Sequence, residues 1–208
     1  NERRALAAAL HSVVADIESA VSEADRRRFV EQAEIFSAHR VLAEDPEMFA
    51  YANGLIAAGK SAAFAWRAAA EAQCEALIAT ANPLLAGRAV DLRDIERQVL
   101  RKLAGDSVVV PDLPPHAVVL ADDLVPSDFP VLVRARVAAI ITAKGGATSH
   151  IAILARAQGI PTLVAVGLPL AEVVGRVTVI VDADNGLLDT APTPERLAAA
   201  QISIERHS

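Results

Sequence analysis

The 208-residue chain carries two different patterns of apolar and polar positions, and the change falls near residue 105. Before that point apolar residues recur at helical spacing, as Leu6, Leu10 and Val13 illustrate, which predicts amphipathic helices. Residues 2–24, 29–44, 48–58, 61–81 and 91–103 are the predicted helices. The first half is therefore expected to be a helical bundle.

Start and stop signals support these boundaries. Asp45 is expected as an N-cap and Pro46 as the first residue of the third helix, because proline lacks the N–H that a first turn leaves unpaired anyway. Gly59 should end that helix, and Asn82-Pro83 marks a break before the last one.

Beyond residue 105 the apolar runs become short and β-branched, with Pro, Gly or Asp clusters between them, which predicts strands. The predicted strands are 108–110, 117–120, 137–141, 162–166 and 177–181, with helical pieces at about 127–134 and 149–158. The sequence thus predicts an all-α domain over residues 1–105 and an α/β domain over 106–208.

Composition narrows the class of protein. Apolar residues make up 53% of the chain but aromatic ones only 3%, so closely packed, alanine-rich helices are favoured over an aromatic core. One cysteine, Cys74, excludes an internal disulfide, and no membrane span is expected from the apolar runs. A net charge of −6 gives no basic surface for nucleic acid. We expect a soluble, cytoplasmic protein whose acidic surface suits a basic protein partner.

The candidate chemistry lies in Gly145-Gly146-Ala147-Thr148-Ser149-His150, at a predicted strand-to-helix turn with Thr148 or Ser149 as N-cap. Unpaired N–H groups and the helix dipole would stabilise an anion there and would favour a neutral, nucleophilic imidazole. A phosphorylated His150 fits best. A serine–histidine pair fits less well, because adjacent residues of a helix point about 100° apart. The alternative is a packing histidine on the apolar stripe that contains Ile153 and Leu154.

Two cationic side chains near this turn are candidate supporting groups. Arg156 lies about 120° around a helix from His150, so a bridge to Asp182 or Asp184 is expected, or a phosphoryl contact made only across an interface. Lys144 would add positive potential. Thr148 is expected to cap the helix and orient the ring.

The string Gly145-Gly146-x-Thr148-Ser149-His150, followed by Ala152-Ile153-Leu154-Ala155-Arg156, resembles the phosphohistidine signature of the phosphoenolpyruvate-utilising enzymes. These include Enzyme I of the sugar phosphotransferase system, phosphoenolpyruvate synthase and pyruvate phosphate dikinase. Three positions depart from the pattern. Ile151 replaces a small residue, Ala147 stands where Enzyme I often has arginine, and Phe129 stands where a threonine can hydrogen-bond the histidine.

The helical half resembles Enzyme I more specifically, in residues 34–39, 42–47 and 88–95, and dikinases lack this insert. Residues 121–128 and 181–186 extend the resemblance over nearly the whole chain. It implies a helical subdomain that docks the phosphocarrier HPr and a swivelling α/β phosphohistidine subdomain. The docking residues it implies are Glu34, His39, Leu42, Glu47, Arg88 and Arg93.

Spacing alone gives these docking residues other roles. His39 reads as a solvated helix residue and Leu42 as part of the core, and the two arginines could balance Asp91 and Asp94 locally.

By this resemblance the chain is the N-terminal half of a phosphotransferase, a transferase that serves sugar transport. His150 would take phosphate from phosphoenolpyruvate and pass it to HPr. A C-terminal barrel outside these residues would bind phosphoenolpyruvate and Mg²⁺, so no metal or cofactor is expected within them. The chain starts inside a helix at Asn1, so we expect the family's opening strand to be missing. The isolated chain should exchange phosphate with HPr but not be charged by phosphoenolpyruvate.

Three alternatives stay open at this point. The parent could be a multiphosphoryl transfer protein, in which Enzyme I-like and HPr-like domains are fused. The α/β half could be the swivelling domain of a dikinase-like enzyme, which predicts no HPr binding. The whole chain could also be a regulatory docking module without catalysis.

Overall fold

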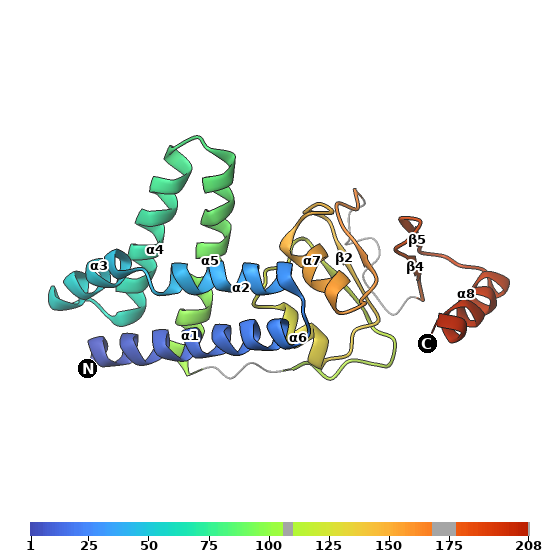
Figure 1. Ribbon diagram of the computed structural model, residues 1–208, viewed down its shortest axis with the longest axis horizontal. Coiled ribbons are helices and arrows are strands. Elements are labelled where there is room, and N and C mark those ends of the chain that lie inside the picture. Colours follow the sequence, from blue (N-terminus) through green and yellow to red (C-terminus); the bar gives the residue numbers. More distant parts are fainter. Residues whose placement is uncertain (106–109, 168–177, 208) are drawn as a thin grey trace. The chain divides into compact units, whose positions relative to one another are not determined.

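A computed structural model describes residues 1–105, 110–167 and 178–207 of the chain (Figure 1). These residues form two compact units. One is helical and contains residues 1–105 together with Val125–Ser127, and the other contains residues 110–124 and the rest of the described chain from Asp128 onward. The short segment Val125–Ser127 therefore groups with the helices, although its sequence position lies within the expected α/β domain.

The helical unit is built from antiparallel and crossing helices (Figure 1). Helix α1 packs beside α2 and α5, and helix α4 packs beside α3 and α5. The elements are α1 (Glu2–Arg26), α2 (Val30–Ala43), α3 (Pro46–Ala57), α4 (Ala62–Ala79) and α5 (Pro83–Ala104). The expected bundle is confirmed.

One predicted boundary is wrong. Helix α5 begins at Pro83 and not at Asp91. Proline is tolerated in the first turn of a helix, where its missing N–H has no intrahelical acceptor. The Asn82-Pro83 pair is therefore the start of the last helix and not only the end of the one before it.

The core of the helical unit combines a few large side chains with many alanines. Trp66 is almost fully buried, as are Leu92, Ile95 and Val99 on α5. The buried alanines of α4 recur at helical spacing, at Ala62, Ala65, Ala69 and Ala70. Because these side chains are small, neighbouring helices can approach closely, as the composition predicted.

A side-chain cap fixes where α3 begins. The Asp45 carboxylate accepts hydrogen bonds from the backbone N–H groups of Glu47 (2.8 Å) and Met48 (3.2 Å) and from the side-chain amide of Gln73 (3.0 Å). The predicted N-cap is confirmed, and it also joins α3 to α4. Gly59 follows the end of α3 with a φ of +87°, a conformation that glycine adopts without strain.

Among the described helices, α1 is long and apolar enough to cross a membrane by length and composition alone. A core helix of a water-soluble protein passes the same test. Residues Leu6, Val13 and Ile17 of α1 are buried, and the helix packs against α2 and α5. The expectation that the chain lacks a membrane span stays a prediction.

The second unit contains a parallel sheet in the order β1-β2-β3 and an antiparallel hairpin, β4–β5. A helix lies in each crossover between the parallel strands, and another helix follows the hairpin. The elements are β1 (Val118–Ala121), α6 (Phe129–Arg134), β2 (Ala139–Thr142), α7 (His150–Ala157), β3 (Thr162–Leu163), β4 (Ile180–Asp182), β5 (Leu187–Asp189) and α8 (Pro194–His207). The expected α/β architecture is confirmed.

Strand β2 is the centre of this unit. All four of its residues are buried, and it pairs in register with both neighbours, Ile141 lying opposite Leu120 and Leu163. Partly buried Val181 and Leu188 of the hairpin pack against the same cluster.

The strand predictions differ from the structure at their margins. Strand β3 ends at Leu163, three residues short of the predicted end, and residues 108 and 109 of the first predicted strand lie outside the described residues. Strand β5 and helix α8 were not predicted from the sequence, although Thr193-Pro194-Glu195 carries the signals of a helix start. Thr193 Oγ accepts a hydrogen bond from the Arg196 N–H at 3.4 Å.

Candidate active site at the start of helix α7

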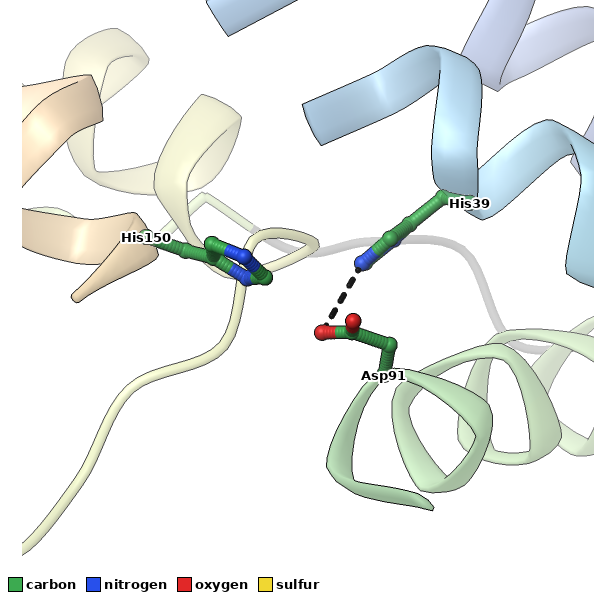
Figure 2. A group of neighbouring side chains, drawn as sticks. All are labelled: His39, Asp91 and His150. Atoms are coloured by element: carbon green, nitrogen blue, oxygen red, sulfur yellow. Dashed lines mark ion pairs between the residues drawn. The ribbon is translucent and has the colours of Figure 1, made fainter. Parts of the chain in front are cut away.

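His150 is the first residue of α7 and is half-buried (Figure 2). Ser149 precedes it in extended conformation and caps the helix, its hydroxyl oxygen accepting a hydrogen bond from the Ala152 N–H at 3.4 Å. Ser149 is thus the N-cap of the two candidates. The cap role expected of Thr148 is wrong, because that residue is exposed and lies before the cap. The imidazole therefore lies at the positive end of the helix dipole.

The two glycines before the helix have different roles in the turn. Gly145 has a φ of +93°, and a Cβ there would lie 3.5 Å from Ser149 Oγ. Gly146 has open space around it, and its carbonyl accepts the Ser149 N–H at 2.9 Å. Only Gly145 is required by backbone conformation, since a side chain there would be strained.

The turn stands at the carboxyl end of β2, the central strand. Open α/β sheets commonly bind ligands at the carboxyl ends of their strands. In the described part of the chain, the backbone N–H groups of Gly145, Gly146, Ala147 and Thr148 donate no hydrogen bond to a protein acceptor. The site thus combines an imidazole with several N–H donors that have no protein acceptor.

Arg156 is held to the turn itself. Its guanidinium donates a hydrogen bond to the Ala147 carbonyl at 3.2 Å. The expected bridge to Asp182 or Asp184 is wrong, because Arg156 makes no ion pair within the described residues, and Asp182 accepts bonds from the Asn185 side chain and backbone. Those bonds, the side-chain one foremost, lower the pKa of Asp182. Lys144 is exposed, and no ion pair holds its side chain in the described residues.

Phe129 stands at the first position of α6 and is almost fully buried. Its ring is a packing group with no hydroxyl to offer. Any hydrogen bond that orients the His150 ring must therefore come from another residue.

The docking candidates of the helical unit differ in exposure. Glu34, Glu47 and Arg88 are exposed, and Leu42 is half-buried. Arg93 is exposed and lies 3.0 Å from Glu96 and 3.9 Å from Glu71, so it does not balance Asp91 or Asp94 as spacing had suggested. The contact of these residues with a partner stays a prediction.

His39 is buried, so the interpretation of it as a solvated helix residue is wrong. Its Nε2 lies 3.3 Å from a carboxylate oxygen of Asp91 on α5, the pair joined by the dashed line in Figure 2. Its Nδ1 lies 3.9 Å from the carboxylate of Asp94. The imidazole thus links α2 to α5 from within the helical unit.

Sequence analysis missed the role of Asp94. This residue is fully buried, and its carboxylate accepts hydrogen bonds from the backbone N–H (3.1 Å) and the hydroxyl of Ser127. Burial raises the pKa of Asp94, and the Ser127 bonds, His39 and Arg97 offset this only in part. The apolar spacing around Ile95 carried no signal for this burial, because adjacent residues of a helix point about 100° apart.

Known proteins match both units of the chain. The family described as "PEP-utilising enzyme, N-terminal" matches residues 1–88, and the family described as "PEP-utilising enzyme, mobile domain" matches residues 113–186, which include His150. An NMR solution structure of Enzyme I is 32% identical with a TM-score of 0.71, covering 99% of this chain and 84% of that one. The chain belongs to the family of PEP-utilising enzymes.

Longer curated relatives carry two names. A multiphosphoryl transfer protein of Rhodobacter capsulatus is 40% identical over 174 residues, which are 83% of this chain and 21% of that protein. A phosphoenolpyruvate-protein phosphotransferase of Geobacillus stearothermophilus is 34% identical over 204 residues, or 97% of this chain and 35% of that protein. The chain thus spans between about a fifth and a third of these relatives.

Proposed function

We propose that this chain is the phosphoryl-carrying N-terminal part of a phosphoenolpyruvate-protein phosphotransferase. His150 receives the phosphoryl group that originates from phosphoenolpyruvate and passes it to HPr. The observation that carries the proposal is the position of His150, the first residue of a capped helix beside available N–H donors. The match of this segment to the mobile domain of PEP-utilising enzymes supports it.

The exchange with HPr balances without any further reactant. A lone pair on a ring nitrogen of His150 forms a P–N bond while the P–N bond of phosphohistidine on HPr breaks, and that histidine regains its lone pair. Two phosphohistidines are similar in energy, so transfer runs in either direction. Helix α7 and the turn before it supply positioning and positive potential, which are the main catalytic terms in phosphoryl transfer.

The helical unit is the proposed docking surface for HPr, through exposed Glu34, Glu47 and Arg88. The match of 99% of the chain to a structure of Enzyme I supports this assignment over a dikinase-like alternative. We also propose that the parent protein works in the cytoplasm and that Mg²⁺ and phosphoenolpyruvate act on a barrel outside these residues. The curated relatives include both phosphoenolpyruvate-protein phosphotransferases and multiphosphoryl transfer proteins. The parent is therefore either a separate phosphotransferase or a fused multiphosphoryl transfer protein.

The test is incubation of the purified chain with phosphorylated HPr, followed by mass mapping of the modified residue at alkaline pH. We expect one acid-labile phosphate on His150 and complete loss of labelling in His150→Ala. His116→Ala is the matched control, because His116 is an exposed histidine of the same unit, and it should label like the wild type.

Binding of HPr without transfer would support the regulatory docking module. Transfer to another residue would contradict the assignment of His150. Incubation with phosphoenolpyruvate and Mg²⁺ alone should leave the chain unlabelled.

A further inference from the structure

The residues that follow β1 and β3 form backbone hydrogen bonds with the start of the turn that leads to His150. On one side, the Ala143 N–H donates to the Ala121 carbonyl (3.0 Å) and the Lys144 N–H to the Asp122 carbonyl (2.9 Å). On the other side, the Ala165 N–H donates to the Lys144 carbonyl at 3.3 Å. The first residues of the turn therefore extend the parallel sheet.

Thr142, the last residue of β2, adds a side-chain bond to this arrangement. It is 2% exposed, and its hydroxyl donates a hydrogen bond to the Lys144 carbonyl at 2.8 Å. A Cβ at Gly145 would lie 4.0 Å from this hydroxyl oxygen and 3.5 Å from Ser149 Oγ. Gly145, with its positive φ, thus lies close to both the Thr142 hydroxyl and the Ser149 cap.

Fixing the Lys144 carbonyl also fixes the N–H that follows it. A trans peptide is planar, so its C=O and N–H point in opposite directions. With the Lys144 carbonyl directed toward Thr142 and Ala165, the Gly145 N–H must point the other way. The Arg156 bond to the Ala147 carbonyl sets the Thr148 N–H in the same manner.

We propose that Thr142 is a positioning residue for phosphoryl transfer at His150, through its bond to the Lys144 carbonyl. This inference rests on the proposed function. In the described residues, Thr142 makes no hydrogen bond to His150, and we assign it no contact with the phosphoryl group. It orients the Lys144–Gly145 peptide, and thereby the turn that ends at the Ser149 cap and the imidazole. A displacement of about 1 Å at a reacting group can cost about a hundredfold in rate, so loss of this bond affects transfer more than folding.

The chain contains a matched control. Thr162, the first residue of β3, makes the same kind of bond, because its hydroxyl donates to the Ile160 carbonyl at 3.0 Å. It belongs to the same sheet, but the carbonyl that it holds lies before β3 and not in the turn before His150. Thr142→Val and Thr162→Val remove equivalent hydroxyls at constant shape. Thr142→Ser restores the hydroxyl at the first position and tests rescue.

The experiment measures the rate of phosphoryl transfer from phospho-HPr to the 208-residue chain over a range of phospho-HPr concentrations. Each chain accepts one phosphoryl group, so the measurement is a single turnover. Thr142→Val should lower the maximal rate constant of transfer about tenfold or more, while the half-saturating concentration of phospho-HPr changes by less than about twofold. Thr142→Ser should return the maximal rate constant to within about threefold of the wild type. Thr162→Val should stay within about twofold throughout. Amide resonances of Gly145 and Gly146 should shift in Thr142→Val and not in Thr162→Val.

The contrary results distinguish failure of the positioning role of Thr142 from failure of the proposed function. Equal rates in the wild type and Thr142→Val, or equal losses in the two valine variants, would overturn the positioning role alone. Failure of the serine variant to recover would do the same. A wild-type chain that takes no phosphate from phospho-HPr would overturn the proposed function and this inference with it. If Thr142→Val does not fold, Thr142→Ala takes its place, because it also removes the hydroxyl but leaves more room.

Discussion

The two units differ in how the polar groups described above are used. In the helical unit, Asp45 accepts hydrogen bonds from three donors, and Asp94 and His39 join α2, α5 and Ser127, whereas buried Gln32 Oε1 and Trp66 Nε1 have no partner among the described residues. In the α/β unit, the N–H groups from Gly145 to Thr148 have no protein acceptor among the described residues. Under the proposed function, these N–H groups are the donors available to a phosphoryl group on His150.

The largest expected effect lies in the helical core. Leu92→Ala should lower the free energy of unfolding of the helical unit by about 2–5 kcal/mol, because it removes a fully buried side chain and leaves a cavity. Urea unfolding followed by the fluorescence of Trp66, the single tryptophan, reports on this unit. Leu187→Ala, at a partly exposed position of β5, is the control and should leave the Trp66 transition unchanged. A loss below about 1 kcal/mol would contradict a tightly packed helical core.

The next effect concerns the two helix caps. Asp45→Ala should destabilise the helical unit by about 1–2 kcal/mol, since three donors lose their acceptor. Ser149→Ala is the control, because Ser149 lies in the other unit and the Trp66 transition reports on the helical unit, so that transition should not move. A Trp66 transition that Asp45→Ala leaves unchanged would show that the Asp45 cap does not stabilise the helical unit.

Much of the division into a helical unit and an α/β unit could be predicted from the sequence. The Asp45-Pro46 cap, the helical spacing around Val13 and the glycine-started turn before His150 carry their own local signals. Contacts between distant segments carried no such signal. The burial of His39 between α2 and α5, the Asp94–Ser127 bonds and the Thr142 hydroxyl depend on the packed structure. Phosphate and partner contacts were inferred from resemblance and stay predictions.

A smaller effect would locate the partner surface. Glu47→Lys should weaken HPr binding about fivefold or more, because it inverts an exposed charge in the first turn of α3 on the proposed docking surface. Glu195→Lys is a matched control, since Glu195 occupies the first turn of α8 in the other unit. Calorimetric titration of HPr into each variant gives the dissociation constants. A larger loss for Glu195→Lys would move the docking surface to the α/β unit.

The smallest expected effect is on stability as a function of pH, to which Asp94 and Asp182 should contribute with opposite signs. Burial raises the pKa of Asp94, whereas bonds from Asn185 lower the pKa of half-buried Asp182. The stability due to Asp94 is fully present below its ordinary value of 3.8 and is lost as pH rises through its folded-state pKa. The stability due to Asp182 is present above 3.8 and is lost as pH falls through its folded-state pKa.

NMR titration of the carboxyl carbons checks both aspartates in one sample. The midpoint of Asp94 should lie above 3.8 and that of Asp182 below it. In Asp94→Asn, the fall in unfolding free energy above pH 3.8, followed by Trp66 fluorescence, should become shallower. Midpoints in the reverse order would contradict the burial of one carboxyl and the hydrogen bonding of the other.

The packing of α1 against both α2 and α5 has a consequence during synthesis on the ribosome. Helix α2 follows α1 directly, but α5 begins at Pro83, 57 residues after α1 ends at Arg26. At roughly 5–20 residues per second, the apolar stripe of the nascent α1 waits about 3–11 seconds for its last partner. During that interval an apolar helix long enough to cross a membrane has one side uncovered. Chaperones that hold emerging chains would find Leu6, Val13 and Ile17 accessible during this interval.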